Sequence, residues 1–300
     1  MKYMEVINMT NKALEINNLN SQIGDFSLSG INFSIEKGTI MGFIGKNGSG
    51  KTTLIKTILN MIPKASGEVL FNGISMFGNE ETVKAKIGVV FDTLIYPLNL
   101  KPTKIKKMIS PFYKTFDCLI FDELMERFEL DPNKKLLTYS KGMQMKFGIV
   151  MALCHSPDLI ILDEPTAGLD PIARAAVIDL LLDLIQNDQK SILFSTHITS
   201  DLEKIADYIT MIDNGKIIFS KGKDEMLDTY LLAHIERDTM TDVIKSELIG
   251  IKETTFGYEG LCTKILKLQD LAGVKTVRPT IEDIMVYMGT IKRRLKERGA

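Results

Sequence analysis

The clearest chemical signal in the sequence is a short glycine-rich segment ending in Lys51 and Thr52. It fits the pattern G-x-x-x-x-G-K-[ST], with the residues Gly45, Lys46, Asn47, Gly48, Ser49, Gly50, Lys51 and Thr52. Glycines let the backbone turn sharply and bring successive N–H groups against a phosphate. The Lys51 ammonium can neutralise β- and γ-phosphate oxygens, and the Thr52 hydroxyl can bind Mg²⁺. We therefore predict a nucleotide-binding loop that also includes the next residue, Thr53.

A second chemical signal follows an apolar run. Leu159–Leu162 has the pattern of a buried strand and is followed by Asp163 and Glu164. Ligands of α/β sheets bind at the carboxyl ends of strands, so Asp163 is a candidate for the Mg²⁺ shell. Glu164 can take a proton from an attacking water or orient it. A solvated acidic turn is the alternative, but two adjacent carboxylates repel each other unless a cation lies between them.

The elements around the glycine-rich segment place it between a strand and a helix. Thr39–Ile44 is mostly apolar, as in a strand covered on both faces, and Thr53–Met61 has apolar residues at helical spacing. The positive end of a helix dipole favours an anion at this position. A glycine-rich turn without a ligand is the alternative, and the strand–loop–helix order disfavours it.

Patterns elsewhere predict further strands, a helical insert and an appended domain. Ala13–Leu19 and Phe26–Ile35 resemble strands, while 98–135 is mostly helical, with a helix over Leu119–Leu130. Asp213–Gly215 is a hairpin turn signal between two strand-like runs. After Lys223, short helical and strand-like runs alternate up to a basic end, Lys292–Arg298, which is either a solvated helix face or a contact with anionic lipid or a partner.

Composition limits the classes of function. The 300 residues are 45% hydrophobic and 25% charged, with a formal net charge of −1. A packed core is expected, and no electrostatic basis for nucleic-acid binding is present. No run reaches the roughly 18 apolar residues of a membrane-spanning helix, and 1–11 lacks the apolar core of a signal peptide. We expect a cytoplasmic protein.

Three further segments, in order, resemble those of a known family. Tyr139–Met143 resembles the signature LSGGQ of ABC transporter ATPases, Ala167–Asp170 their D-loop, and His197 their switch histidine. Together with the two acidic residues and the glycine-rich loop, the resemblance covers roughly 13–222. It implies an α/β fold of the P-loop NTPase type, with a mixed central sheet flanked by helices, an antiparallel β subdomain and a helical subdomain.

This resemblance also implies boundaries and a mechanism. The ATPase domain would span 1–222, with its helical subdomain at about 93–145, and 223–300 would be a small C-terminal α+β extension. Two ATPase subunits would face each other with two ATP molecules between them. Ser140 and the Gly142 N–H would contact the γ-phosphate bound by the partner. His197 would sense the γ-phosphate and position water beside Glu164, the catalytic carboxylate.

The resemblance is closest to bacterial exporters whose ATPase and permease are separate chains. Thr280–Met285 is similar to the T-x-E-D-I-M segment that ends the C-terminal extension of such ATPases. Antimicrobial- and toxic-peptide exporters, including the phenol-soluble-modulin type, are the group expected. The chain would then lie on the inner face of the cell membrane through its permease, which would dock near Asp92 and 98–130.

Several positions depart from the family pattern. Asp92 stands where the Q-loop glutamine is expected, and a carboxylate there could still bind Mg²⁺. Lys141 replaces a signature glycine and is either solvent-facing or an added cation near the nucleotide. Ile23 stands where an aromatic residue stacks on adenine, so Ile23 could give apolar contact, while Phe26 could stack on the ring or belong to the core.

Two other classes of function stay open from the sequence. A soluble ABC ATPase without a membrane partner usually has two ATPase domains, a long coiled coil or zinc modules, and none of these is indicated. A regulatory subunit with little turnover is disfavoured by Lys51, Asp163, Glu164 and His197.

Overall fold

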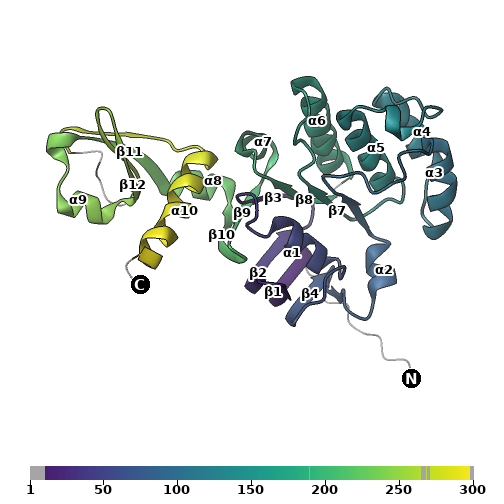
Figure 1. Ribbon diagram of the computed structural model, residues 1–300, viewed down its shortest axis with the longest axis horizontal. Coiled ribbons are helices and arrows are strands. Elements are labelled where there is room, and N and C mark those ends of the chain that lie inside the picture. Colours follow the sequence, from purple (N-terminus) through teal and green to yellow (C-terminus); the bar gives the residue numbers. More distant parts are fainter. Residues whose placement is uncertain (1–10, 189, 265–267, 269–270, 298–300) are drawn as a thin grey trace.

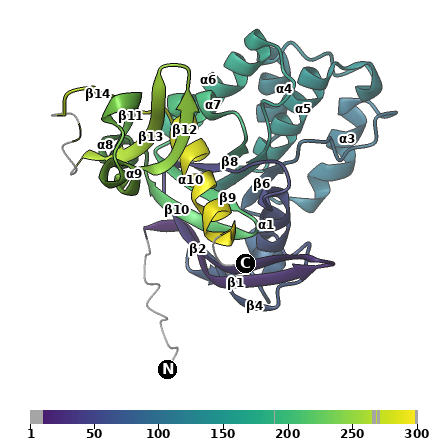
Figure 2. The same cartoon turned by 60° about the vertical axis from the view of Figure 1, so that its left-hand side comes forward.

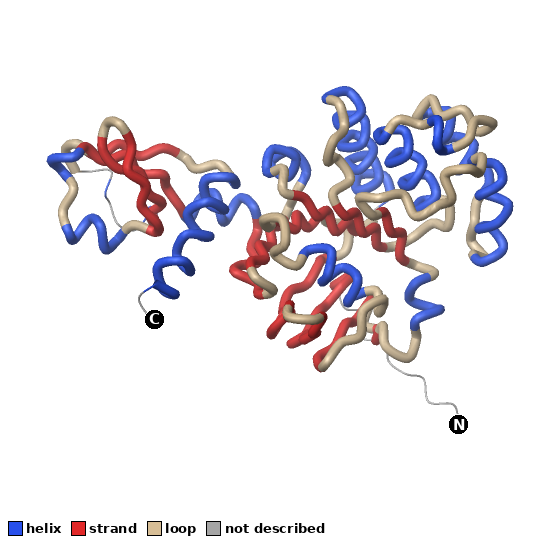
Figure 3. Tube along the Cα trace, viewed as in Figure 1, coloured by secondary structure: helices blue, strands red, loops and turns tan. Residues whose placement is uncertain are grey.

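The computed structural model describes residues 11–188, 190–264, 268 and 271–297. Its strands form three sheets, two in the larger part of the molecule and one in a smaller part that includes the C-terminal helix (Figures 1 and 3). The polar N-terminal stretch considered for a signal peptide lies, except for Asn11, outside the described residues.

The first sheet is antiparallel, as expected for the β subdomain. Its strand order is β2-β1-β4-β5, formed by Phe26–Glu36, Lys12–Ile23, Ser66–Phe71 and Ile74–Ser75. The β1–β2 hairpin closes between Ile23 and Phe26, where Gly24 adopts a φ of 55° that costs glycine little. Both strand predictions in this region are confirmed, and β1 is longer than its apolar run.

The central sheet is mixed and has the order β10-β9-β3-β8-β7-β6. Its strands are β3 (Ile40–Ile44), β6 (Ile87–Val90), β7 (Leu159–Asp163), β8 (Ser191–Thr196), β9 (Tyr208–Asp213) and β10 (Lys216–Gly222). All pairs are parallel except β9–β10, the predicted hairpin. Every residue of β3, β7 and β8 is buried, because layers cover both faces.

Two hydrophobic clusters lie on opposite faces of this sheet. Ile40 and Ile44 of β3 belong to the cluster on the helical side, and Met41 and Phe43 to the cluster shared with α1 and the antiparallel sheet. Side chains of a strand alternate between faces, so one strand contributes to both cores. The carboxyl ends of β3, β7 and β8 are thereby fixed side by side.

Helix α1 (Lys51–Ile58) follows β3 and differs from its predicted bounds. It begins at Lys51, two residues before the apolar spacing that predicted Thr53, because Gly50 with φ 110° forms its N-cap. Lys51 and Thr52 therefore stand in the first helical turn rather than in a loop. The helix ends before Asn60, whose φ of 50° is left-handed.

The larger part also carries helices α2 to α7, and the expected helical insert is among them. They span Glu80–Lys84, Pro102–Ile109, Cys118–Arg127, Lys141–Leu153, Pro171–Asp188 and Thr199–Ile205. Helix α4 covers most of the predicted 119–130 helix. Asp117 caps it by accepting a hydrogen bond from the Leu119 N–H at 2.7 Å, and Glu129 with φ 55° follows its end.

The smaller part is a four-stranded antiparallel sheet with helices around it. The strand order is β12-β13-β11-β14, and the strands span Ile249–Thr254, Gly257–Thr263, Tyr230–Glu236 and Val274–Val277. The helices α8, α9 and α10 span Lys223–Thr229, Asp242–Glu247 and Ile281–Glu297. This is the α+β character expected after residue 222. The side chains of the basic end, 292–298, lie outside the described residues.

Helix α10 lies between the third sheet and strands β9 and β10 (Figures 1 and 2). Ile281 and Ile284 are fully buried and belong to the same hydrophobic cluster as the helical face of the central sheet. The Ile281 N–H also donates to Glu203 Oε1 of α7 at 3.1 Å. One continuous core therefore joins the two parts.

Candidate functional site

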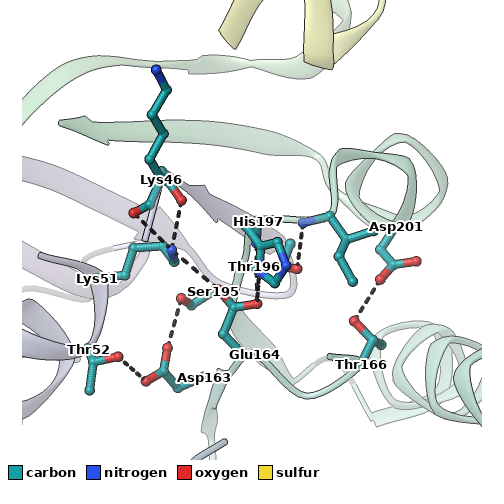
Figure 4. A network of polar contacts seen from close by, with 12 residues as sticks. Lys46, Lys51, Thr52, Asp163, Glu164, Thr166, Ser195, Thr196, His197 and Asp201 are labelled. Atoms are coloured by element: carbon teal, nitrogen blue, oxygen red, sulfur yellow. Dashed lines mark hydrogen bonds and ion pairs between the residues drawn. The ribbon is translucent and has the colours of Figure 1, made fainter. Parts of the chain in front are cut away.

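The two sequence segments with the strongest chemical signals meet at the ends of β3 and β7. Thr52 donates from Oγ1 to Asp163 Oδ2 at 2.6 Å, and Ser195 of β8 donates to Asp163 Oδ1 at 2.9 Å (Figure 4). Burial raises the pKa of Asp163, the two hydrogen bonds lower it, and the charges of Glu164 and Asp92 raise it further. A cation at this carboxylate would offset the cost of burying its charge.

Glu164 lies between a lysine and a histidine. Its Oε1 is 3.3 Å from Lys51 Nζ, and its Oε2 is 2.7 Å from His197 Nδ1. The backbone N–H of His197 also donates to Oε2 at 3.3 Å. The backbone of Glu164 has a φ of 54°, in the left-handed region that residues other than glycine rarely adopt. In this conformation the carboxylate faces both Lys51 and His197. A carboxylate fixed in this way can accept a proton from water.

The glycine-rich segment is shaped by close approaches that only glycine allows. A Cβ on Gly45 would lie 2.4 Å from Ser49 Oγ and 2.6 Å from the carbonyl oxygen of Ile212. Lys51 donates from Nζ to the Gly45 carbonyl at 2.7 Å, so the lysine side chain folds back across the segment. Gly48, with φ 79°, faces open space.

These residues fit the phosphates of a nucleotide. No side chain caps α1, so the N–H groups of its first turn point into the glycine-rich segment without a side-chain acceptor. Among the described residues, Ser49 Oγ is the buried side-chain oxygen without a hydrogen-bond partner. Backbone donors, a buried hydroxyl and the Lys51 ammonium are the groups that a phosphate accepts from. Thr53 also lies in the first turn of α1.

The donor set for Mg²⁺ is small. In the part of the chain that the structure describes, no three His, Cys, Asp or Glu side chains are arranged to hold a metal. Mg²⁺ on nucleotides usually takes one or two carboxylates and the phosphates themselves. Thr52 and Asp163 fit this pattern, and the ion would supply charge neutralisation of the phosphate oxygens. Asp92 is exposed, and its charge reaches Asp163, but no hydrogen bond to Thr52 or Asp163 is recorded for it.

The signature-like residues lie elsewhere in the same chain. Ser140 is the N-cap of α5 and accepts from the Met143 N–H at 3.2 Å, and Gly142 is in the first turn. Among the described residues, neither forms a hydrogen bond or ion pair with the glycine-rich segment.

Asp92 and Lys141 line one cavity of about 260 Å³, together with Gln144 of α5. The Lys141 ammonium lies over Gly168, 3.2 Å from the position that a Cβ would take there. Neither charged side chain forms an ion pair or hydrogen bond with another described residue. The two residues that depart from the family pattern, Asp92 and Lys141, thus bring opposite charges to the same cavity.

Phe26 is half-buried. Its ring lies against Gly50, where a Cβ would be 2.7 Å from Phe26 Cζ, and it joins the cluster of the antiparallel sheet. The two interpretations of Phe26, a ring that stacks on adenine and a core position, both stay predictions. Ile23, at the end of β1, is 40% exposed and available for apolar contact.

Sequence reasoning missed Ser195 and a buried polar network behind the site. Thr166 donates to Asp201 Oδ2 at 2.7 Å, and Arg174 donates from Nε to Asp201 Oδ1 at 2.6 Å. Ser195 could have been found, because it stands at the end of the apolar strand before His197. Asp201, 1% exposed, gives no such signal, since its partners are distant in sequence.

The fold and site define a P-loop ATPase, and comparison with known proteins gives the family. The ABC transporter family profile matches residues 28–167. The chain is 31% identical over 229 residues to the ABC transporter ATP-binding protein YtrB of Bacillus subtilis, covering 75% of this chain and 77% of that protein. It is 32% identical over 214 residues to the lantibiotic transport ATP-binding protein SrtF of Streptococcus pyogenes, covering 70% of this chain and 91% of that protein.

Two further comparisons agree. The bacitracin transport ATP-binding protein BcrA of Bacillus licheniformis is 33% identical over 194 residues, or 64% of this chain and 63% of that protein. A solved structure of the ATP-binding subunit of an ABC transporter is similar, with a TM-score of 0.66 and 26% sequence identity. The similarity covers 71% of this chain and 91% of that chain. This chain belongs to the ATP-binding proteins of ABC transporters and is an ABC-type ATPase. The predicted family, fold class and enzyme class are confirmed.

Proposed function

We propose that this chain powers the export of peptides through separate membrane subunits. Peptide antibiotics are the substrate class favoured, because relatives are named for lantibiotic and bacitracin transport. The chain would work as a pair of ATPase subunits, each ATP contacting the glycine-rich loop of one subunit and Ser140 and Gly142 of the other. The pair would sit on the inner face of the membrane through the permease.

The site supports a division of roles. Lys51 and the N–H groups of α1 would hold the phosphates, while Thr52, Asp163 and, from across the site, Asp92 would hold Mg²⁺. Glu164 would take the proton of the attacking water, and its contact with His197 at 2.7 Å supports this role. The boundary between the ATPase domain, 1–222, and an accessory domain, 223–300, fits the three sheets.

The observation that carries the transporter assignment is the surface of the helical part. Large apolar side chains are exposed there, namely Ile95, Leu98, Met108, Phe112, Leu119 and Leu137. These six exposed side chains all come from the segment 95–137, and exposed apolar side chains there support a contact with another protein. Among the described residues, no helix combines the length and apolar character needed to cross a membrane.

Capture of the tagged chain from detergent-solubilised membranes tests this proposal. We expect a multi-span membrane protein to copurify, and Phe112→Ser, at a position 82% exposed, to reduce its recovery. Phe256→Ser is the matched control, since Phe256 is 90% exposed but lies in the turn between β12 and β13, away from the helical part. Recovery with ribosomes and without a membrane protein would support the soluble alternative. Uptake of labelled peptide into inverted vesicles then tests the substrate class.

A further inference from the structure

A buried carboxylate, Asp201, joins the chain segments that follow Glu164 and His197. Thr166, two residues after Glu164, donates from Oγ1 to Asp201 Oδ2 at 2.7 Å (Figure 4). Asp201 lies four residues after His197, in the first turn of α7. The segments that carry the contacting pair, Glu164 and His197, are therefore bonded to each other a second time beyond that pair.

Both connections to this second bond are short and closed by hydrogen bonds. The Glu164 carbonyl accepts from the Ala167 N–H at 3.1 Å. After His197, the Ile198 carbonyl accepts from the Asp201 N–H at 3.3 Å. Each bond joins a carbonyl to the N–H three residues later, as in a β-turn, and so limits the freedom of the residues between. The bond to Asp201 therefore limits where both side chains of the pair can lie.

Arg174 of α6 holds Asp201 from the other side. It donates from Nε to Asp201 Oδ1 at 2.6 Å, and its Nη2 donates to Ser200 Oγ at 3.0 Å. Asp201 is 1% exposed, so its charge is buried and pairs with the guanidinium. Replacing a buried ion pair by apolar side chains of similar volume often costs no stability. The geometry that this pair imposes on α6 and α7 is therefore the effect to test.

We propose that the network of Thr166, Asp201 and Arg174 positions His197 against Glu164. The two bonds to Asp201 keep the start of α7 beside the segment that follows β7, and this keeps His197 Nδ1 at 2.7 Å from Glu164 Oε2. The three residues act through His197 and are positioning residues, not catalytic ones. The inference rests on the roles in ATP hydrolysis proposed for Glu164 and His197.

Thr166→Val and Thr166→Ser form a matched pair for testing the network in the full-length protein. Valine has the shape of threonine without the hydroxyl, whereas serine keeps the donor to Asp201. We expect kcat for ATP to be about tenfold lower in the Val variant than in the Ser variant, the size of one hydrogen bond to a charged group. The dissociation constant for fluorescent ATP should be the same in both, because Lys51 and α1 hold the phosphates.

The NMR signals of the His197 ring report its position directly. The chain has three histidines, so the ring signal of His197 can be assigned by its loss in His197→Gln. In Thr166→Val we expect this signal to move or split, while the signals of His155 and His234 stay in place. A purely structural role of Thr166 would leave the His197 signal unchanged or move all three.

A second pair of variants and a control make the test independent of any single substitution. Arg174→Met removes the ion pair and Arg174→Lys keeps the positive charge, so the Met variant should displace the His197 signal more. Thr210→Val is the control, because the Thr210 hydroxyl on β9 is also buried and bonds to Ser220. Its loss should leave kcat and all three histidine signals unchanged.

The outcomes separate this proposal from the proposed function. An unchanged His197 signal in both Thr166→Val and Arg174→Met, equal displacement in the Val and Ser variants, or displacement of all three histidine signals would overturn the positioning role. A displaced His197 signal with unchanged kcat would support the positioning role and count against the part proposed for His197 in hydrolysis.

Discussion

The contacts of Glu164 fix the orientation of its carboxylate and place a positive charge beside it. One carboxylate oxygen faces the Lys51 ammonium and the other faces the ring and N–H of His197. Asp163, next in the chain, points to Thr52 and Ser195 instead. Adjacent carboxylates thus have separate partners, which supports separate roles in holding a cation and in activating water.

Glu164→Gln should remove ATP turnover while leaving ATP binding. Glutamine keeps the size of the side chain but cannot accept a proton, and a general base contributes about 10²–10⁴-fold to a rate. We expect phosphate release to fall at least about 100-fold and an ATP-bound dimer to accumulate, measured by malachite green assay and gel filtration. Glu123→Gln, an exposed change on α4, is the matched control. Turnover close to that of the unaltered protein would exclude Glu164 as the base.

Residue patterns predicted the members of this site because each follows an apolar strand of a parallel sheet. Asp163, Glu164 and His197 all stand at such ends, and sheet geometry brings those ends together. Phe26 could not be assigned in the same way. Its ring packs against Gly50, and the hydrophobic pattern gives no indication of this approach.

At the scale of elements, the segment after β6 meets the first turn of α5. Asp92 comes from the former and Lys141 from the latter, and the two side chains line the same cavity. Because α5 begins with the signature-like residues, a charge interaction here would connect the end of the central sheet with the surface expected to face a partner subunit.

Asp92→Asn and Lys141→Met should therefore have non-additive effects on ATP turnover. Removing one charge leaves the other without compensation, whereas removing both restores neutrality in the cavity. We expect a coupling energy of about 0.5–1 kcal/mol in kcat/KM from a double-mutant cycle. Additive effects within about 0.3 kcal/mol would mean that the two side chains act independently.

Element types were more predictable than element ends. Apolar spacing predicted α1 and α4, but their bounds depend on Gly50, Asn60 and Glu129, which adopt positive φ values. Non-glycine residues in that region are uncommon, so sequence alone gives little warning of them. The side-chain cap at Asp117 is the kind of signal that could have moved the start of α4 by one residue.

At the scale of the whole molecule, the core that joins the two parts was not predictable. The sequence indicated a change of character near residue 223, but not that Ile281 and Ile284 would enter the main hydrophobic cluster. Their partners lie far away in sequence, and the amphipathic pattern of a helix predicts a buried face but not the element against which that face packs.

Stability of the whole chain should fall in mild acid because of His155. This residue is 4% exposed, stacks on Tyr113 and lies 3.2 Å from the Ile87 carbonyl oxygen through Nε2. Burial lowers the pKa of His155 below its ordinary value of 6.5, opposed by backbone hydrogen bonds, with Lys190 and Lys86 adding to the lowering. Below pH 6.5 the unfolded chain therefore binds more protons than the folded chain at this position.

The free energy of unfolding should decrease as the pH falls from 6.5 through the lower pKa of the folded state, and then level off. Urea titrations at several pH values measure it. His155→Gln keeps a donor for the Ile87 carbonyl but does not titrate, so its stability should fall less over this range. Parallel curves for the two proteins would contradict the prediction.

The shared core also limits how such chains can recombine. A chimera made by exchanging everything after Gly222 would place α10 of one protein on α7 of another. Leu202, Glu203 and Ile205 of α7 belong to the surface that α10 meets, through the common cluster and the bond to Ile281. An ancestral or engineered exchange of C-terminal parts would have to carry these three residues with it, so the inherited unit is larger than the segment that follows the ATPase sheet.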